Sequence, residues 1–594
     1  MDQTSPEPDR PWLAAYAPGV PADIDPPELA LTQILDRTVR RYPDRPAVDF
    51  LGAGMSYRQL GVAVARAAGA LHRLGVKPGM RVALVLPNCP QHVVAFYAVL
   101  RLGAIVVEHN PLYTVDELRT QFADHRADLA ICWSATAPSV VQAGTRTVLS
   151  VDLAAALPWS RRLLLGLPLP AARAARAALG PAQPPPGGLS WERAVAQASP
   201  LPADHPHPRV SDVAALQYTG GTTGTPKGAV LTHANLAANA AQSRAWAPGL
   251  EDGRETFLAV LPMFHAYGLT LCLTTAIAIA ARVVLMPRFD AEQTLDAIRR
   301  TRPTFLPGVP PIYARLAEGA RERGVDLTSI RYALSGAMPL PADLIRRWEE
   351  LTGGLLIEGY GMTETSPITV GNPMSAARRP GSIGVPYPST RIRVVDPEDP
   401  TREVPNGTPG ELLVQGPQVF AGYWERPEES AAVLLPGGWV RTGDVVEQGA
   451  DGFVRMVDRV KDLIITGGFN VYPGEVEGVL RSHPDVADAA VVGLPGPDGS
   501  ETVAAAVVAL PGRTLAPDAL RAHCREHLAG YKVPRRFSVV EDLPRSVIGK
   551  ALHRQVRADL QADLRADLQT DTGDGASTHA DTGDGASTRA DGPR

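Results

Sequence analysis

One short stretch of the chain concentrates the residue types that bind phosphate. Residues 218–228 read Tyr-Thr-Gly-Gly-Thr-Thr-Gly-Thr-Pro-Lys-Gly. The glycines let backbone N–H groups turn toward an anion, the threonine hydroxyls add donors, and Lys227 supplies a positive charge. We therefore predict a loop that binds a polyphosphate. The competing interpretation is a flexible surface hairpin, because a glycine-rich loop alone is a weak signal.

Lysine is scarce in this chain, so its positions carry information. The sequence has 58 basic residues, and the lysines among them are Lys77, Lys227, Lys461, Lys532 and Lys550. A chain that supplies surface charge with arginine should keep lysine where a compact, flexible ammonium group is chemically required. This reasoning applies most strongly to Lys227 and Lys550, and it predicts that both take part in the chemistry.

The elements that must position these residues follow an alternating pattern. Apolar strand-like runs at 81–86 and 104–107 flank a helical pattern, and similar runs follow at 129–133 and 147–151. Strand, helix and strand repeated at this interval predict an α/β domain with a largely parallel sheet. Further along, several apolar strands end directly in glycine, as at Gly308 and Gly336, where backbone can approach a flat ligand.

The domain organisation follows from changes in pattern along the chain. We expect an N-terminal extension at 1–29, a large α/β domain at 30–458 whose part from about 385 to 458 is β-rich, and a small α+β domain at 459–557. The final segment, 558–594, consists of short repeats rich in Asp, Gly, Ser and Thr. Its low hydrophobicity predicts a disordered tail.

Composition excludes several classes of protein. The net charge is −5 and 45% of the residues are hydrophobic, which argues against a nucleic-acid binder and against a disordered chain. Four cysteines without a CxxC pair fit a reducing cytoplasm, and the N-terminus lacks the pattern of a secretory signal. The longest apolar run, about 266–281, is too short to span a bilayer and predicts a buried helix. We expect a cytoplasmic protein.

A basic segment lies between Asp152 and Glu192, with no acidic residue inside it. Arginines alternate there with leucines and alanines, and such a segment can lie on an anionic membrane surface. The alternative is an Ala/Pro-rich insertion, which we favour because Pro168 and Pro170 interrupt the hydrophobic face. Peripheral contact with the inner membrane surface stays open.

Five motifs in order along the chain resemble the adenylate-forming superfamily, which includes acyl-CoA synthetases, luciferases and the adenylation domains of peptide synthetases. They are the loop 218–228, Tyr-Gly-Met-Thr-Glu at 360–364, Arg-Thr-Gly-Asp at 441–444, Asp-Arg-Val-Lys-Asp at 458–462 and Pro-Arg-Ser-Val-Ile-Gly-Lys at 544–550. Within that group the chain is most similar to a long-chain fatty-acid–CoA ligase, on the Tyr-Thr-Gly-Gly opening of the loop and the runs 306–313 and 467–473.

This resemblance implies an ATP-dependent, AMP-forming ligation of a medium- or long-chain fatty acid to CoA through an acyl-adenylate. It implies that Lys550 is the cation beside the attacking carboxylate, that Glu364 binds Mg²⁺ and that His265 flanks the acyl carbonyl. The residues implied to bind ATP or AMP are Thr219, Gly220, Gly221, Thr222, Thr223, Gly224, Lys227, Gly336, Ala337, Glu358, Gly359, Tyr360, Gly361, Met362, Thr363, Asp444 and Arg459.

The resemblance also implies that the small C-terminal domain is mobile. It rotates between the two half-reactions about a hinge that matches Lys461, and Gly467, Gly468 and Phe469 then meet CoA. Tyr360 is implied to stack on adenine, and Asp444 and Arg459 to contact the ribose. The expected partners are therefore a fatty acid, ATP and CoA, without nucleic acid, and a homodimer is one form of assembly that stays open.

Other functions remain open at this stage. The same family offers an aryl- or branched-acid CoA ligase, and an acyl-AMP ligase that serves a carrier protein. A different class offers a P-loop kinase or NTPase, although that motif needs Ser or Thr after its lysine, whereas Lys227 is followed by Gly228. A binding protein without turnover is a further alternative.

Overall fold

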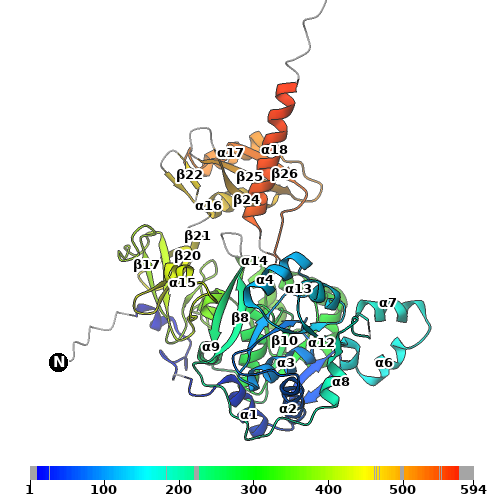
Figure 1. Ribbon diagram of the computed structural model, residues 1–594. Coiled ribbons are helices and arrows are strands. Elements are labelled where there is room, and N and C mark those ends of the chain that lie inside the picture. The colour runs from blue at the N-terminus through cyan, green and yellow to red at the C-terminus, as the bar shows by residue number, and fades with distance from the viewer. Residues whose placement is uncertain are drawn as a thin grey trace, which may run out of the picture. The chain divides into compact units, whose positions relative to one another are not determined.

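The computed structural model describes residues 10–573, except 26, 182, 220–225, 460–461, 463, 467–468, 496–500, 547–548 and 550. The chain folds into two compact units, Met1–Lys461 and Asp462–Arg594 (Figure 1). The sequence places its domain boundary after Asp458, close to this division. Both units mix helices and strands, which confirms the predicted α/β fold class with a small α+β domain.

One sheet of the first unit carries the strands around the predicted phosphate loop. Its order is β7 (Leu189–Ser190), β6 (Thr147–Val151), β5 (Leu129–Trp133), β3 (Arg81–Val85), β4 (Ile105–Glu108), β8 (Val213–Thr219) and β9 (Lys227–Thr232). All neighbouring pairs are parallel except β8 and β9, which are antiparallel. The predicted parallel sheet is therefore confirmed, and β9 is its antiparallel edge strand.

A second sheet carries the glycine-terminated strands. Its order is β16 (Val385–Pro386), β15 (Ile368–Gly371), β14 (Leu355–Gly361), β13 (Tyr332–Ser335), β12 (Phe305–Gly308), β10 (Thr256–Ala259), β11 (Arg282–Leu285), β1 (Pro46–Phe50) and β2 (Ala53–Ser56). The run from β14 through β1 is parallel, and antiparallel strands close both edges. Parallel neighbours end at the same edge, so the ends of β12, β13 and β14 lie together.

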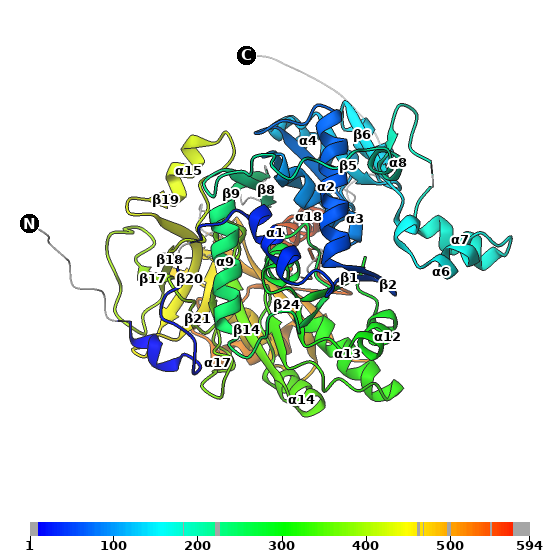
Figure 2. The same ribbon diagram turned by 90° about the horizontal axis from the view of Figure 1, so that it is seen from below.

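Helices cover and separate these two sheets (Figure 2). α3 (Pro90–Arg101) is buried along its whole length, because it packs against β3 and β4 of one sheet and β1 of the other. The other helical elements of the unit are η1 (Pro11–Ala15), α1 (Leu31–Arg41), α2 (Tyr57–Arg73), α4 (Val115–His125), α5 (Ala137–Gln142), η2 (Leu153–Ala156), α6 (Trp159–Leu165), α7 (Pro170–Ala178), α8 (Trp191–Ala196), α9 (His233–Trp246), α10 (Ala266–Gly268), η3 (Leu269–Thr274), α11 (Thr275–Ala278), α12 (Ala291–Thr301), α13 (Pro310–Arg323), α14 (Ala342–Thr352), η4 (Thr363–Thr365) and α15 (Pro427–Val433).

The longest apolar run of the sequence forms the buried helical stretch α10–η3–α11, as predicted, with η3 wound as a π-helix. In the part of the chain that the structure describes, none of the helices combines the length and apolar character that crossing a bilayer requires.

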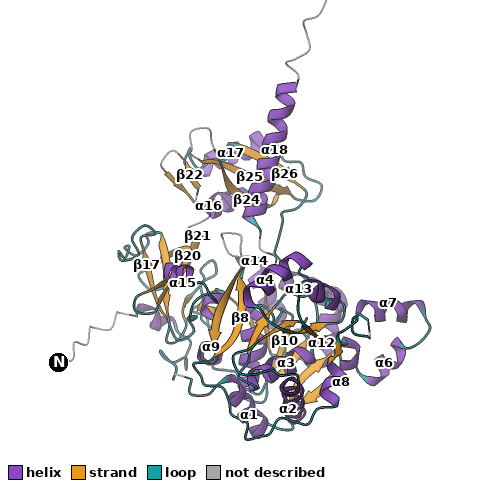
Figure 3. Cartoon of the chain, in the orientation of Figure 1, coloured by secondary structure: helices purple, strands orange, loops and turns teal. Residues whose placement is uncertain are grey.

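The predicted β-rich part forms a third sheet of the first unit (Figure 3). It contains β17 (Arg391–Val395), β18 (Gly410–Gln415), β19 (Leu434–Leu435), β20 (Trp439–Gln448) and β21 (Val454–Arg459). Its pairings are antiparallel, and inward residues such as Leu412, Val414 and Val440 are fully buried. The strand β18 is buried from Gly410 through Val414 without alternation, so both of its faces are covered there.

The second unit has its own core. β24 (Val486–Pro495), β25 (Glu501–Ala509) and β26 (Arg536–Val540) form a sheet, and β22 (Ile464–Thr466) pairs with β23 (Phe469–Val471). The helices are α16 (Pro473–Arg481), α17 (Pro517–His527) and α18 (His553–Gly573). Buried side chains from β24, β25, α16 and α17 make one apolar cluster. A small domain with its own core can behave as a separate body.

The predicted disordered tail needs a correction. Residues 553–573 form the single helix α18, so disorder from residue 558 onward was wrong for this part. The repeated Ala-Asp-Leu unit recurs every four residues, which places its leucines along one helical stripe. Leu560 and Val556 are buried against β24 and β25 and so anchor the helix. Residues 574–594 lie outside the described part of the chain.

Candidate active site

The predicted phosphate loop connects two antiparallel strands. Thr219 ends β8 and pairs with Lys227, the first residue of β9. The loop residues Gly220, Gly221, Thr222, Thr223 and Gly224 lie outside the described residues. In a P-loop the glycine-rich segment leads from a strand into the N-terminus of a helix. Because Lys227 instead begins a strand, the P-loop kinase alternative was wrong.

Polar contacts hold the base of this hairpin. The Tyr218 hydroxyl donates to Asp124 Oδ2 at 2.7 Å, and Arg426 Nη2 donates to Asp124 Oδ1 at 2.6 Å. The chain just before Arg426 pairs with the free edge of β9, where the backbone N–H of Trp424 donates to Gly228 O at 2.8 Å. These contacts bring the segment 421–426 from the β-rich part alongside β9, the strand that begins at Lys227.

Tyr423 connects two of the predicted site residues. Its ring centroid lies 5.2 Å from Lys227 Nζ, and its hydroxyl donates to Glu364 Oε1 at 2.7 Å. Glu364 is buried, with 6% of its surface exposed. Burial, with the neighbouring Glu364 carboxylate, raises the pKa of Tyr423, so its hydroxyl stays protonated and donates. Tyr423 was not predicted from the sequence, because a single tyrosine after a glycine forms no recognisable motif.

The segment that carries Glu364 is held in a fixed shape. Gly361 ends β14, and a Cβ atom added there would lie 1.8 Å from Pro367 O, so only glycine fits. The backbone N–H of Met362 donates to Pro367 O at 3.1 Å, and the Thr365 hydroxyl donates to the same oxygen at 2.6 Å. These bonds form the turn η4, which contains both Thr363 and Glu364.

The start of the same segment holds two other predicted residues, Glu358 and Gly359. The backbone of Glu358 in β14 accepts from the N–H of Asn372, and burial raises the pKa of the Glu358 carboxyl to about 8. Gly359 faces Leu334 at ordinary contact distance and would accept a Cβ atom. The Glu358 carboxyl is therefore largely protonated at neutral pH and can donate a hydrogen bond.

The predicted adenine and ribose residues meet each other. The Tyr360 hydroxyl donates to Asp444 Oδ2 at 2.6 Å, and Asp444 is buried. The β20–β21 register places Asp444 directly opposite Arg459, whose side chain lies outside the described residues. The turn before Asp444 is anchored by Glu411, which accepts from the Gly443 N–H at 3.1 Å and pairs with Arg441.

Gly336 and Ala337 follow β13, at the edge where the parallel strands end. A Cβ atom added to Gly336 would lie 3.2 Å from the Tyr267 ring, whose hydroxyl donates to Leu334 O at 2.7 Å. Ala337 has a positive φ of 67°. The sequence explains the glycine at position 336 by the close approach of a flat ligand. The structure adds a second reason, because the Tyr267 ring packs against this position.

His265 is the N-cap residue of α10 and lies next to Tyr267. Its Nδ1 accepts the Tyr267 N–H at 3.3 Å. Burial lowers the pKa of His265 to about 4, because a charged imidazole would lose its hydration there. The ring is therefore neutral at physiological pH and places no positive charge at this position.

Most of the predicted residues at and beyond the boundary between the units are not described. Lys461, Gly467, Gly468 and Lys550 lie outside the described residues, and Phe469 is described only as the first backbone position of β23. Lys532, in contrast, forms an ion pair with Glu475 at 2.7 Å. That contact gives Lys532 a structural role within the second unit.

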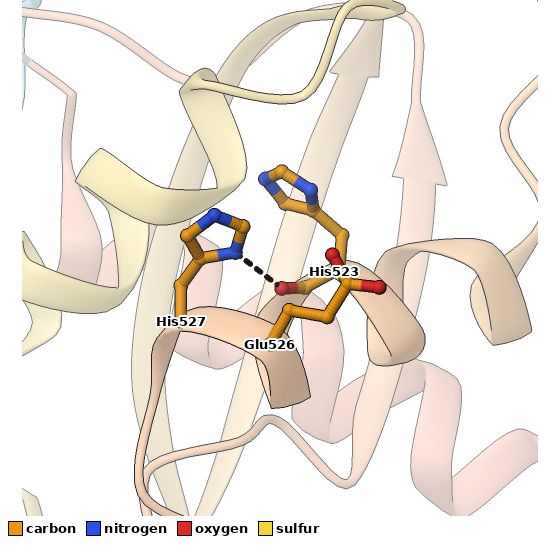
Figure 4. Close-up of side chains that lie close together, drawn as sticks. All are labelled: His523, Glu526 and His527. Atoms are coloured by element: carbon orange, nitrogen blue, oxygen red, sulfur yellow. Dashed lines mark hydrogen bonds between the residues drawn. The ribbon is translucent and has the colours of Figure 1, made fainter.

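A group of metal-ligand residue types lies on α17, away from any predicted site residue in sequence (Figure 4). His523 Nε2 bonds with Ser482 Oγ at 2.9 Å, and His527 Nδ1 bonds with the backbone oxygen of His523 at 2.9 Å. Glu526 and His527 are exposed. Because these ring nitrogens are already hydrogen-bonded and such surface groups are common, we assign no metal here.

Comparison with known proteins decides the family. The model of the AMP-binding enzyme family matches residues 35–424, and the model of the AMP-binding enzyme C-terminal domain matches residues 475–550. The chain belongs to the AMP-binding enzymes. Curated relatives place it among the AMP-forming acyl-CoA ligases of that family, for which ATP and CoA are the fitting co-substrates.

The similar proteins include two ligases named for long-chain fatty acids. The long-chain-fatty-acid–CoA ligase of Bacillus subtilis is 37% identical over 552 residues, and that of Yersinia pestis is 38% identical over 555 residues. Each match covers 92% of this chain and 97% of the relative. The feruloyl-CoA synthase of an Amycolatopsis species is 37% identical and covers 88% of this chain and 97% of the relative.

A solved structure confirms the fold. ATP-bound MatB from Rhodopseudomonas palustris has a TM-score of 0.76 with 31% identity, over 89% of this chain and 99% of that one. The fold of this acyl-CoA ligase is therefore that of the adenylate-forming ligases.

Proposed function

We propose that this acyl-CoA ligase joins a medium- or long-chain fatty acid to CoA. The observation that carries the proposal is its identity of 37% and 38% with ligases named for long-chain fatty acids, over 92% of its length. The Tyr-Thr-Gly-Gly opening of the phosphate loop supports the same substrate class by resemblance. The assignment of residues below is part of the proposal.

In the first half-reaction, a carboxylate oxygen of the acid attacks the α-phosphorus of ATP. The bond from that phosphorus to the bridging oxygen breaks, pyrophosphate leaves, and an acyl-adenylate forms. Negative charge grows on the phosphoryl oxygens, so fixed cations lower the barrier. We assign Lys550 to the reacting carboxylate and α-phosphate, and Lys227 with Thr219 and the loop 220–224 to the β- and γ-phosphates.

Tyr423 contacts both Lys227 and Glu364 in this arrangement. Because its ring lies beside Lys227 Nζ and its hydroxyl bonds to Glu364, it sets the positions of a cation and an anion relative to each other. Glu364 fits a Mg²⁺ site, since it offers a buried carboxylate that Tyr423 links to Lys227, and carboxylate and phosphate oxygens are the ligands that Mg²⁺ prefers. When bound, Mg²⁺ would neutralise phosphate charge.

The nucleoside would lie between two groups of residues. We assign the ring of Tyr360 to the adenine, against the backbone of Gly336 and Ala337, and Asp444 to the ribose hydroxyls, since one carboxylate can accept both hydrogen bonds. Arg459, opposite Asp444 in the sheet, reaches the same sugar in this scheme.

In the second half-reaction, the sulfur of CoA attacks the acyl carbonyl, the acyl–phosphate C–O bond breaks, and AMP leaves. We propose that the second unit rotates about Lys461 between the half-reactions, which withdraws Lys550 and brings Gly467, Gly468 and Phe469 to CoA. A neutral His265 fits a position beside the acyl carbonyl, because it would not compete with Lys550 for the carboxylate charge.

A second candidate substrate class is an aromatic acid. The relative named feruloyl-CoA synthase is 37% identical over 523 residues, as similar as the fatty-acid ligases. The ligase named for anthranilate, solved with anthranoyl-AMP, has a TM-score of 0.76 with 26% identity. Fold therefore does not separate the two substrate classes, whereas the fatty-acid ligases match over more of this chain, 92% against 88%.

One acid panel tests the proposal. The full-length enzyme receives ATP, MgCl₂ and CoA with laurate, palmitate, stearate, ferulate, coumarate or benzoate, and AMP release is measured. We expect CoA-dependent AMP release with the saturated fatty acids to exceed that with the aromatic acids by at least about tenfold in kcat/KM, the discrimination that a pocket of matching shape provides. Preference for an aromatic acid would replace the fatty-acid assignment, and ADP as product would contradict the reaction itself.

A further inference from the structure

The helices α6 and α7 form a hairpin that extends away from the sheets of the first unit (Figures 1 and 2). The hairpin belongs to the basic segment between Asp152 and Glu192. From the sequence, Pro168 and Pro170 are expected to break one hydrophobic face. The structure gives them another place: Pro170 is the first residue of α7, and Pro168 lies in the connection between the two helices. The prolines therefore separate two helices and interrupt neither.

Large apolar side chains gather on this hairpin and face solvent. Among the described residues, fourteen large hydrophobic side chains are exposed, and five of them lie between residues 159 and 169. They are Trp159 (75% exposed), Leu163 (65%), Leu164 (60%), Leu167 (43%) and Leu169 (55%). None of the residues of α6 is buried, so the folded chain does not cover this group. Contiguous exposed apolar groups indicate a surface that meets a partner.

The charge of the hairpin has one sign. Residues 153–191 contain no aspartate or glutamate, and Arg161, Arg162 and Arg173 are exposed without an ion pair among the described residues. Arg176 differs, because it pairs with Asp152 at 3.0 Å and so ties α7 to the body of the unit. A cavity of about 240 Å³ at the base of the hairpin is lined by Arg162, Leu165 and Gly166 together with Asp152 and Arg176.

We infer that the α6–α7 hairpin is a docking surface for a membrane that contains anionic phospholipid. Tryptophan and leucine enter the boundary between headgroups and acyl chains, while arginines at the same height pair with lipid phosphates. Trp159 and Leu163 are four residues apart and share one face of α6. Arg161 and Arg162 lie between them in sequence. This placement sets the apolar residues at membrane depth and the guanidinium groups at the headgroups.

An anionic membrane matches the observations better than a protein surface does. The arginines lie along the hairpin without an acidic neighbour, so their charge complements a uniformly negative surface. The leucines at the tip of the hairpin are best buried in an apolar layer that is deep enough to cover them. The inference holds whatever acid the enzyme activates, because it concerns a segment that contributes none of the assigned active-site residues.

Vesicle binding tests the charge contribution. Full-length protein is sedimented with vesicles of phosphatidylcholine containing phosphatidylglycerol, and with vesicles of phosphatidylcholine alone, without acid, ATP or CoA. The wild type should bind the anionic vesicles, and Arg161→Glu/Arg162→Glu should weaken that binding by at least about tenfold, since each basic residue near such a surface contributes about fivefold. The matched control Arg315→Glu/Arg321→Glu changes the net charge equally at exposed positions on α13 and should bind like the wild type.

A second variant tests the apolar contribution. Trp159→Ser/Leu163→Ser/Leu164→Ser should also reduce binding by about tenfold or more, because three side chains no longer enter the bilayer. Its control, Val62→Ser/Leu112→Ser/Val539→Ser, removes three exposed apolar residues elsewhere. Brominated lipids should quench the fluorescence of the wild type more than that of Trp159→Phe, which reports the depth of Trp159 directly.

Thermal unfolding of each variant excludes a trivial loss through misfolding, because the hairpin is exposed and its variants should melt like the wild type. The inference is overturned if the wild type fails to bind anionic vesicles, if hairpin and control variants lose binding equally, or if Trp159→Phe leaves the quenching unchanged. None of these results depends on which acid is the substrate, so they leave the proposed function unaffected.

Discussion

The hydroxyl of Tyr360 donates a hydrogen bond to Asp444 Oδ2 at 2.6 Å, which joins the residue proposed for adenine to the residue proposed for ribose. The two residues come from different sheets, Tyr360 from β14 and Asp444 from β20, and are separated by 84 positions in sequence. A carboxylate held by a tyrosine is fixed in orientation before the nucleotide arrives. Such positioning lowers the cost of binding, because less freedom is lost on association.

The first prediction tests this bond. Tyr360→Phe keeps the ring for stacking and removes the donor, so the KM for ATP should rise by about tenfold, the usual value of a hydrogen bond to a charged group. Asp444→Asn should raise it as well, and the double variant should be less impaired than the two effects multiplied, because both remove the same bond. Steady-state kinetics with varied ATP measure this, with Tyr42→Phe as the control. Multiplicative effects would mean that the bond does not couple the residues.

The second prediction concerns Tyr423. Tyr423→Phe should raise the MgCl₂ concentration needed for half-maximal pyrophosphate exchange by about tenfold, because Glu364 loses the donor that orients it. Tyr423→Ala also removes the ring beside Lys227 and should therefore raise the KM for ATP too. Exchange assays over a MgCl₂ series and an ATP series separate the two effects. If Phe and Ala variants behave alike in both series, Tyr423 does not link the two groups.

Much of the fold was predictable because its signals are local. Apolar runs such as 81–86 and 129–133 are buried strands of a parallel sheet, and strands of that kind appear in sequence as continuous hydrophobic segments. The α18 helix was missed although its signal is also local. Its leucines recur every four residues, but the polar composition of the repeat outweighed that spacing in the prediction.

The site was harder to predict from the sequence than the fold, because its contacts join segments that are distant in the chain. Tyr423 and Glu364 are 59 positions apart and meet only because the chain at 421–424 pairs with the free edge of β9. Gly336 shows the opposite difficulty. The sequence marks it as special, yet the packing of Tyr267 explains it as well as a ligand does.

The third prediction uses the space around a glycine. Gly361→Ala should destabilise the first unit and lower adenylation by about 100-fold or more, because its Cβ would overlap Pro367 O and displace the turn that carries Glu364. Gly478→Ala is the matched control, since nothing lies within 4 Å of a Cβ in the helix α16. That variant should gain about 0.5–1 kcal/mol of stability. Thermal unfolding and pyrophosphate exchange measure both variants, and a fully active Gly361→Ala enzyme would contradict the packing argument.

The fourth prediction concerns pH and the buried histidines His109 and His233. Burial lowers the pKa of each to about 4, whereas an unfolded chain has its histidines near 6.5. The unfolded state therefore binds more protons between these values. Stability should be complete above pH 6.5 and fall as the pH drops through 6.5 toward 4, by roughly 3 kcal/mol for each histidine. Urea unfolding at several pH values measures this slope. His109→Gln should flatten it and the exposed His72→Asn should not, so equal slopes in all three proteins would contradict the prediction.

The fifth prediction compares Lys550 with Lys532, the last two lysines in the sequence. Lys550→Ala should lower pyrophosphate exchange by about 100-fold or more, because a fixed cation at the transferring phosphoryl group is lost. The same variant should convert added acyl-adenylate and CoA to acyl-CoA at a rate near that of the wild type, since the proposed mechanism gives Lys550 no role after adenylation. Lys532→Ala removes only an ion pair with Glu475, a contact at the surface that is worth about 1 kcal/mol or less. Its exchange rate should therefore stay within about twofold of the wild type. Normal exchange by Lys550→Ala, or equal loss in both half-reactions, would remove Lys550 from the adenylation step.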